Sequence, residues 1–159
     1  DVWGRAERGT RGDPPAREND MTQTLREIMQ TDPVTVESTD PVVRAADLMR
    51  DNDIGDVLVT DQGKLVGILT DRDIVIRAVA GSSGTVDAMC GQVCTNSVIR
   101  LSPDDTFDDA AAVMADNALR RVPVVEGEQI VGIITLGDLA VEADPDSVLS
   151  EISAAPPHN

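Results

Sequence analysis

One heptapeptide occurs twice in this chain, first as Gly67-Ile68-Leu69-Thr70-Asp71-Arg72-Asp73 and again, 65 positions later, as Gly132-Ile133-Ile134-Thr135-Leu136-Gly137-Asp138. In each copy an apolar run ends in Thr-x-x-Asp, which is typical of a strand that passes directly into a helix. The threonine hydroxyl then caps the helix, and the aspartate accepts hydrogen bonds from backbone N–H groups. The same geometry also suits a ligand, because N–H groups at a helix start bind phosphate and a carboxylate accepts both hydroxyls of a ribose. Taken alone, the pattern favours helix capping.

The duplication extends well beyond the heptapeptide. Residues 25–75 align with residues 90–140 without a gap, and thirteen of the 51 aligned positions are identical, where about three are expected by chance. A duplicated supersecondary unit is therefore predicted. The two copies are called the first repeat and the second repeat below.

Each repeat is predicted to fold in the order β-α-β-β-α, because β-branched runs alternate with apolar residues at helical spacing. The first repeat has expected strands near 34–36, 57–59 and 64–70, with helices near 41–51 and 72–80. Asp40 is the expected N-cap of the first helix, followed by Pro41 in its first position. The second repeat has expected strands near 98–101, 122–125 and 129–135, with helices near 106–115 and from 137 onward.

A helix between the first two strands predicts a parallel pair, and the tight turns at 61–63 and 126–128 predict hairpins. Some 55 residues bury too little core on their own. The predicted fold class is therefore α/β, with α+β type units: two β-α-β-β-α repeats packed sheet to sheet with pseudo-twofold symmetry, leaving two equivalent clefts. Residues 1–21 are expected to be a disordered leader or an expression remnant, 22–81 the first domain, 82–85 a linker, 86–145 the second domain and 146–159 a tail. Helices on only one face of each sheet further predict a homodimer.

Composition excludes several function classes. Thirteen Lys and Arg against 29 Asp and Glu give a net charge of −16, and aromatic residues make up 1%, which excludes general nucleic-acid binding. His158 is the single histidine, so Ser-His-Asp catalysis and His-rich metal sites are excluded, and neither an enzyme nor a metal site is expected. No apolar run approaches 18 residues, which argues against a membrane span.

Two cysteines, Cys90 and Cys94, are too few for a disulfide scaffold, and a reducing cytoplasm fits them best. A buried apolar pair is the main interpretation of the two thiols. A redox switch or half of a metal site is the minor alternative.

The Gly-Ile-x-Thr-x-x-Asp strings, the run Arg-Arg-Val-Pro-Val-Val at 120–125 and the 65-residue duplication resemble a tandem pair of CBS (cystathionine β-synthase-type) domains over about residues 22–143. Such pairs are regulatory modules that commonly bind AMP, ADP, ATP or S-adenosylmethionine. The resemblance implies that Asp73 and Asp138 hold ribose and that Thr70 and Thr135 hold the first phosphate. It also implies that the backbone near Val34 and Ile99, and near Ile54-Gly55 and Leu119-Arg120, meets the adenine. The complete expected sites are, for site 1, Val34, Ile54, Gly55, Ile68, Thr70, Arg72, Asp73, Arg120 and Arg121, and for site 2, Ile99, Leu119, Ile133, Thr135 and Asp138.

The resemblance also implies that residues just before the second strand of one repeat extend to the phosphate held by the other repeat. The second repeat supplies Arg120-Arg121 there, whereas the first supplies Gly55-Asp56. Residues 86–149 hold three basic against twelve acidic residues, so two adjacent arginines indicate a phosphate site, although either alone fits an ion-paired strand edge.

The two expected sites should therefore differ in their ligands. The site of Asp73 is expected to favour charged nucleotides. The site of Asp138 faces Asp56 and has Gly137 where the first has Arg72. It is expected to bind phosphates weakly, to prefer a less anionic adenosine ligand, or to stay empty.

Two functions of different class remain open at this point. The first is a free-standing sensor of AMP, ADP or ATP, without an obligatory cofactor, whose ligand changes the contact with a regulated partner protein. The second is a ligand-free homodimerisation or scaffold module in which the Thr-x-x-Asp strings only cap helices. A binder of ligands similar to S-adenosylmethionine is a further alternative.

Overall fold

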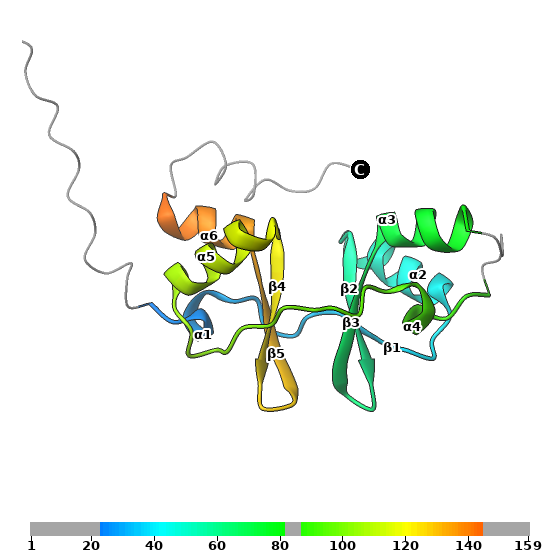
Figure 1. Cartoon of the computed structure of the whole chain (residues 1–159), viewed down its shortest axis with the longest axis horizontal. Coiled ribbons are helices and arrows are strands. Elements are labelled where there is room, and N and C mark those ends of the chain that lie inside the picture. Colours follow the sequence, from blue (N-terminus) through cyan, green and yellow to red (C-terminus); the bar gives the residue numbers. More distant parts are fainter. Residues whose placement is uncertain (1–22, 82–86, 145–159) are drawn as a thin grey trace, which may run out of the picture.

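The computed structural model describes residues 23–81 and 87–144. The expected leader, linker and tail therefore lie outside the described residues. The chain forms two α/β halves whose sheets stand side by side in the middle of the molecule, with the longer helices on the outer sides (Figure 1). This arrangement confirms the predicted fold class and the sheet-to-sheet packing of the two repeats.

The first repeat contains a three-stranded sheet in the order β1-β2-β3. Strand β1 (Thr35–Glu37) runs parallel to β2 (Asp56–Asp61), which is antiparallel to β3 (Lys64–Thr70). Helix α2 (Val42–Asn52) connects β1 to β2. At the β2–β3 turn, Gln62 and Gly63 have φ values of +50° and +80°, which is the conformation that a two-residue hairpin turn requires.

The second repeat contains α5 (Phe107–Asn117), β4 (Arg121–Glu126), β5 (Gln129–Thr135) and α6 (Leu136–Ala143). The expected strand at 98–101 is wrong, because only a single parallel bridge forms, between Leu101 and Val124. In the first repeat the Ser38 N–H donates to the Thr60 carbonyl oxygen at 2.7 Å. The Leu58 N–H likewise donates to the Val34 carbonyl oxygen at 3.0 Å. The equivalent donor positions in the second repeat are Pro103 and Pro123. Neither has an N–H, so the ladder is interrupted on both sides of the single bridge.

The first helix of each repeat begins two residues after Asp40 or its equivalent, Asp105. Helix α2 has Pro41 as its N-cap residue, so the expected capping role of Asp40 is wrong. The Asp40 carboxylate instead accepts a hydrogen bond from the Glu37 N–H at 2.9 Å, and Asp105 does the same for the Ser102 N–H at 2.7 Å. Both aspartates therefore stabilise the turn before the helix rather than the helix itself.

The last helix of the first repeat departs from a regular α-helix. It begins as α3 (Asp71–Asp73) and continues as a π-helical segment, η1 (Ile74–Val79). The Ala80 N–H bonds the Val75 carbonyl oxygen at 2.9 Å, which is the five-residue spacing of a π-helix. A Cβ atom on Gly81 would collide with the Arg77 carbonyl oxygen, so this helix end requires glycine.

The sequence did not predict two short helices, each of which belongs to one repeat and packs against the other. Helix α1 (Leu25–Ile28) lies next to the second repeat, and α4 (Cys90–Val93) lies next to the first (Figure 1). The Leu25 N–H donates to the Asp105 carbonyl oxygen and the Cys90 N–H to the Asp40 carbonyl oxygen, both at 2.8 Å. These bonds are equivalent under the 65-residue repeat. Each repeat therefore contributes its leading segment to the core of the other.

The exchange requires glycine in the heptapeptides. Residues Gln30 and Ile133 exchange two backbone hydrogen bonds of 2.9 Å, and Ile68 and Thr95 form the equivalent pair. A Cβ atom on Gly132 would lie 2.7 Å from the Gln30 carbonyl oxygen. A register shift also lies beside each glycine, between Val59 and Thr60 and between Val124 and Val125. The two glycines are therefore needed for two reasons: each lies at a β-bulge, and each allows the exchanged segment to approach the strand closely.

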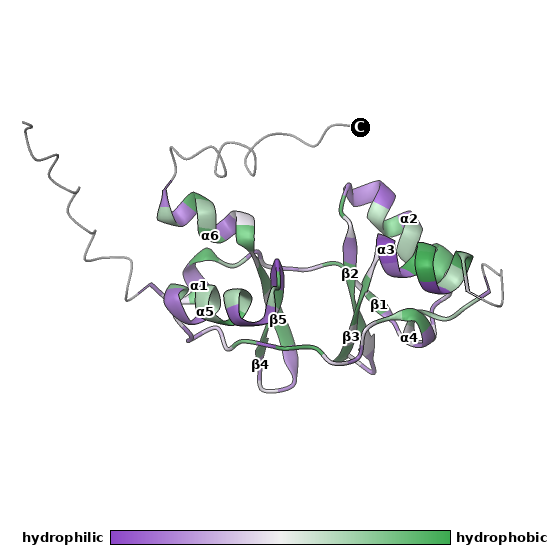
Figure 2. Ribbon diagram, turned by 45° about the horizontal axis from the view of Figure 1, so that its top comes forward, coloured by the Kyte–Doolittle hydropathy of each residue, from purple (hydrophilic) through white to green (hydrophobic). Residues whose placement is uncertain are grey.

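A third apolar core joins the two repeats across their sheets. It contains Leu58 and Leu65 from the first repeat, and Val125 and Ile133 from the second. The strands are apolar in the middle of the molecule, whereas the hairpin tips are hydrophilic (Figure 2). At those tips Lys64 and Glu128 form an ion pair of 2.9 Å, which is exposed and contributes little stability.

Candidate functional site

The two Thr-x-x-Asp strings form capping boxes. Thr70 Oγ1 accepts a hydrogen bond from the Asp73 N–H at 3.1 Å, and Asp73 Oδ2 accepts one from the Thr70 N–H at 3.0 Å. Thr135 and Asp138 repeat the arrangement with distances of 3.2 and 2.8 Å. The capping interpretation of these strings is therefore confirmed.

Each capping carboxylate keeps its second oxygen outside the box. In the first repeat, Asp73 Oδ1 forms an ion pair of 3.4 Å with Arg77. In the second, Asp138 Oδ1 accepts a hydrogen bond of 2.9 Å from Gln30 Nε2, in the exchanged leading segment. The capping function thus leaves Oδ1 to contact other groups, and those groups differ between the two repeats.

The start of the second strand of each repeat lies directly beside its capping box. Asp56 pairs with Thr70 in the β2–β3 ladder, and Arg121 pairs with Thr135 in the β4–β5 ladder. The residues just before them bind the helix starts, because the Asp71 N–H donates to the Gly55 carbonyl oxygen at 3.0 Å and the Leu136 N–H donates to that of Arg120 at 2.8 Å. Strand start and capping box are therefore held together in both repeats.

An ion pair between Asp56 and Arg121, called the inter-repeat ion pair below, connects these two places. The partners occupy equivalent positions of the duplication, 65 residues apart. The Asp56 side chain is 10% exposed and that of Arg121 is 39% exposed. Burial lowers the pKa of Arg121, but a guanidinium stays protonated in a protein. Arg121 therefore does extend to the first repeat, where its partner is a carboxylate.

The remaining expected site residues lie on both sides of this ion pair. Arg72 and Arg120 are exposed, and no hydrogen bond or ion pair between described residues joins either of them to Asp73. Ile54 and Ile99 are 36% and 38% exposed. Ile68 and Ile133 use their backbone groups to bind the exchanged segments. Val34, Leu119 and Gly55 are partly buried. A shared ligand site of Asp73 with Arg120 and Arg121 stays a prediction.

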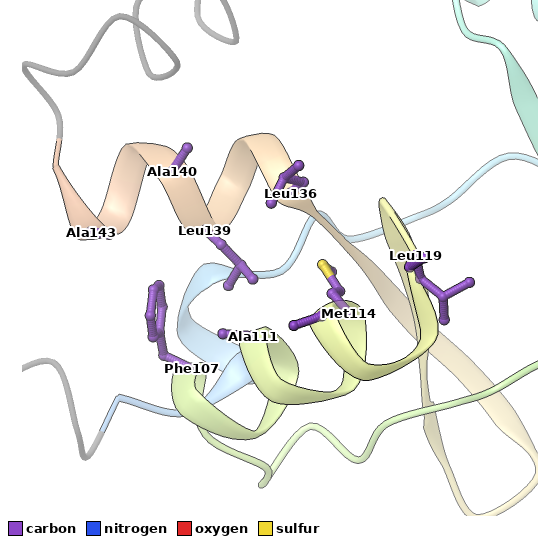
Figure 3. Close-up of a pocket in the computed structure, with 10 residues that line it drawn as sticks. Phe107, Ala111, Met114, Leu119, Leu136, Leu139, Ala140 and Ala143 are labelled. Atoms are coloured by element: carbon purple, nitrogen blue, oxygen red, sulfur yellow. The ribbon is translucent and has the colours of Figure 1, made fainter.

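A separate hollow of about 400 Å³ lies between α5 and α6 (Figure 3). Apolar side chains line it, including those of Phe107, Met114, Leu119 and Leu139. Of the expected site residues, it contains only Leu119. Sequence analysis missed this hollow, although apolar residues at helical spacing in 107–119 and 136–143 indicate that two helices face each other there.

The two thiols are buried and unpaired, as the main interpretation predicted. Cys90 is fully buried and Cys94 is 7% exposed. Burial raises the pKa of the Cys90 thiol to about 11 and also raises that of Cys94. Among the described residues no group of three or more His, Cys, Asp and Glu side chains is placed to hold a metal ion. The structure thus supports packing as the role of these cysteines.

We expect both thiols to resist alkylation in the folded protein at pH 8. The thiolate is the reacting species, and a pKa near 11 in place of 9.0 lowers the thiolate fraction of Cys90 by roughly a hundredfold. Mass spectrometry after iodoacetamide treatment should show slow labelling in buffer and fast labelling of both cysteines in urea. Labelling in buffer should rise as the pH approaches 11. Equal rates in buffer and urea would contradict the buried positions and revive a redox role.

Within residues 23–81 and 87–144, none of the helices is long and apolar enough to cross a bilayer.

The chain is similar in sequence and structure to several known proteins. The family model of the CBS domain matches residues 25–79 and 90–143. The CBS domain-containing protein YhcV of Bacillus subtilis is 36% identical over 119 residues, covering 74% of this chain and 84% of that protein. Among solved structures, Hypoxic Response Protein I with two coordinated zinc ions has a TM-score of 0.68 and 32% identity, covering 76% of this chain and 98% of the other. The CBS domain pair of protein MJ0100, in complex with 5′-methylthioadenosine and S-adenosyl-L-methionine, has a TM-score of 0.66 and 29% identity, covering 75% and 94%.

Proposed function

The chain belongs to the CBS domain family, and from this premise we propose that it is a regulatory module that binds AMP, ADP or ATP between its two repeats and thereby changes its contact with a partner protein. The supporting observation is the paired arrangement of two Thr-Asp capping boxes on either side of the inter-repeat ion pair. A related domain pair binds adenosine compounds, which supports the adenosine class of ligand.

The proposed site residues would contact different parts of the nucleotide, according to their chemistry. The Oδ1 atoms of Asp73 and Asp138 lie outside the capping boxes and suit the hydroxyls of a ribose. Thr70 and Thr135 stand at helix starts, where N–H groups favour an anion. Arg121 begins β4 opposite Thr135, but its side chain contacts Asp56, opposite Thr70, and so brings positive charge to the capping box of the first repeat. The site of Asp73 is therefore the proposed nucleotide site, and the site of Asp138 is proposed to take a less anionic adenosine ligand.

A ligand-free homodimerisation or scaffold module is the second candidate, and the capping boxes favour it, because capping alone explains both Thr-x-x-Asp strings. An exposed apolar surface supports a homodimer in either case: on η1, Val75, Ile76 and Val79 are 55%, 54% and 62% exposed. The free thiols support a cytoplasmic location, because reducing compartments keep cysteines unpaired.

We expect AMP or ATP to raise the melting temperature, whereas a scaffold module should melt at the same temperature with every adenosine compound. At a hundred times the dissociation constant a ligand stabilises the fold by about 2.7 kcal/mol, which corresponds to a shift of about 5–10 °C for a chain of this size. Adenosine and S-adenosylmethionine belong in the same series, because they test the less anionic class of ligand.

The variant Asp73→Ala should weaken nucleotide binding at least tenfold by titration calorimetry. The matched control is Asp109→Ala, because Asp109 forms the same capping box with Thr106 at the start of α5 and is no predicted ligand residue. Both variants should lose roughly 0.3–1.5 kcal/mol of stability because each loses the aspartate half of a capping box, but only Asp73→Ala should lose affinity. Unchanged binding in Asp73→Ala would refute the assigned site.

A further inference from the structure

The inter-repeat ion pair carries a consequence for ligand selection. Arg121 Nη1 forms its ion pair with the buried Oδ2 atom of Asp56, and no hydrogen bond from another described residue reaches this atom. A buried carboxylate needs such a compensating cation. Arg121 in turn is the one arginine of the expected phosphate site that makes an ion pair with a described residue. Each partner therefore limits what the other can bind.

The ladder register places Asp56 beside the proposed nucleotide site of Asp73, whereas the sequence analysis expected Asp56 to face the site of Asp138. Asp56 stands opposite Thr70, whose hydroxyl and N–H belong to the capping box with Asp73. A phosphate that binds at Thr70 and uses Arg121 must come close to the Asp56 carboxylate. Like charges a few ångströms apart repel by an amount that corresponds to roughly tenfold in affinity or more.

We propose that Asp56 is a specificity-determining residue that competes with a ligand phosphate for Arg121, so that phosphate binding opens the inter-repeat ion pair. The inference rests on the proposed function, because it presupposes an adenosine ligand at the site of Asp73. It adds a mechanism in two parts. The carboxylate of Asp56 sets the affinity for phosphorylated ligands. When the ligand displaces this carboxylate from Arg121, the contact between the two repeats changes.

The variant Asp56→Asn tests this competition. It keeps the shape of the side chain and removes its charge, and Arg121, at 39% exposure, can turn to solvent without the pair. Calorimetry should show AMP binding about tenfold tighter than in wild type, with adenosine binding unchanged because adenosine has no phosphate. When Arg121→Gln is already present, adding Asp56→Asn should increase the affinity for AMP much less than it does in wild type.

A matched control is Asp53→Asn, which removes one negative charge three positions away. Asp53 is exposed and has φ +54°, a conformation that asparagine accepts well. AMP affinity should change little in this variant. A gain equal to that of Asp56→Asn would mean that only net charge matters, and it would overturn the competition.

The possible failures are distinguishable. If wild type binds AMP and Asp56→Asn binds it no tighter, the competition is wrong and the proposed function stands. If wild type and Asp56→Asn bind neither adenosine nor AMP, the proposed function fails and the competition fails with it. Should Asp56→Asn melt below room temperature, the Arg121 Nε–H resonance of wild type provides the readout. AMP should shift it and adenosine should not, and equal shifts with both would overturn the inference.

Discussion

A chain divided between its repeats is expected to lose its fold in both pieces. Fragments 1–81 and 86–159 each hold one complete sequence repeat, but each lacks a core segment that the other supplies. Leu25 is fully buried in the core of the second repeat, and Cys90 and Val93 belong to the core of the first. The separate fragments should therefore show poorly dispersed amide NMR spectra, and an equimolar mixture should recover dispersion.

The control for this experiment is the whole chain cut once within residues 82–86, through an inserted protease site. All core segments are then present, so the nicked protein should keep the spectrum of the intact chain. A dispersed spectrum from fragment 86–159 alone would contradict the exchange, because that fragment contains neither Leu25 nor the Gln30 backbone that pairs with Ile133.

The substitution Leu25→Ala should destabilise the protein by about 2–5 kcal/mol, as expected for truncation of a fully buried leucine. The effect should appear in the other repeat: hydrogen exchange should accelerate first at β4, β5 and α5, whose residues Val122, Ile134 and Ala110 share the core of Leu25. Urea titration measures the loss in free energy of unfolding. Hydrogen exchange with mass spectrometry shows which elements are destabilised.

The control Val43→Ala shortens an apolar side chain that is 42% exposed on α2, and it should cost less than about 0.5 kcal/mol. Accelerated exchange confined to residues 35–79 in Leu25→Ala would contradict the assignment of α1 to the second repeat.

The sequence was sufficient for the hairpins and for the helices that pack on them. Strand β3 occupies the predicted residues 64–70, because alternating apolar residues and the Gln62-Gly63 turn specify both its register and its start. The missing strand at 98–101 can also be traced to the sequence, since Pro103 and Pro123 each remove one backbone donor. The prolines were visible in the sequence, but their effect is clear only from the structure of the first repeat, where Ser38 and Leu58 donate at the equivalent positions.

The exchange of α1 and α4 was not predictable in the same way. An internal alignment shows that Leu25 corresponds to Cys90, but it does not show which of two similar cores each residue enters. Gly67 and Gly132 are a partial signal, because a glycine within a strand permits a close approach of another group or marks a bulge. The structure identifies that group as the exchanged backbone of Thr95 and Gln30.

The sequence predicted which residues belong to the candidate site, but it did not predict that Asp56 and Arg121 form an ion pair. The contrast between Asp56 and Arg121 was visible as a charge difference between aligned positions, and it suggested two sites of unequal character. That the two side chains bind each other depends on the angle at which the sheets meet, which a sequence pattern does not encode. The structure changes the interpretation of Arg121 accordingly. The sequence predicted a free arginine that binds phosphate, whereas this arginine is already paired with a carboxylate.

The exchanged leading segments also constrain how the protein is made. A ribosome synthesises Gln30 about a hundred residues before Ile133, its backbone partner. During that interval Leu25 and its neighbours have no core to enter, since contacts so distant in sequence form late. The nascent chain therefore exposes an apolar arm until its second half has emerged, which is the period when newly made chains are prone to aggregate.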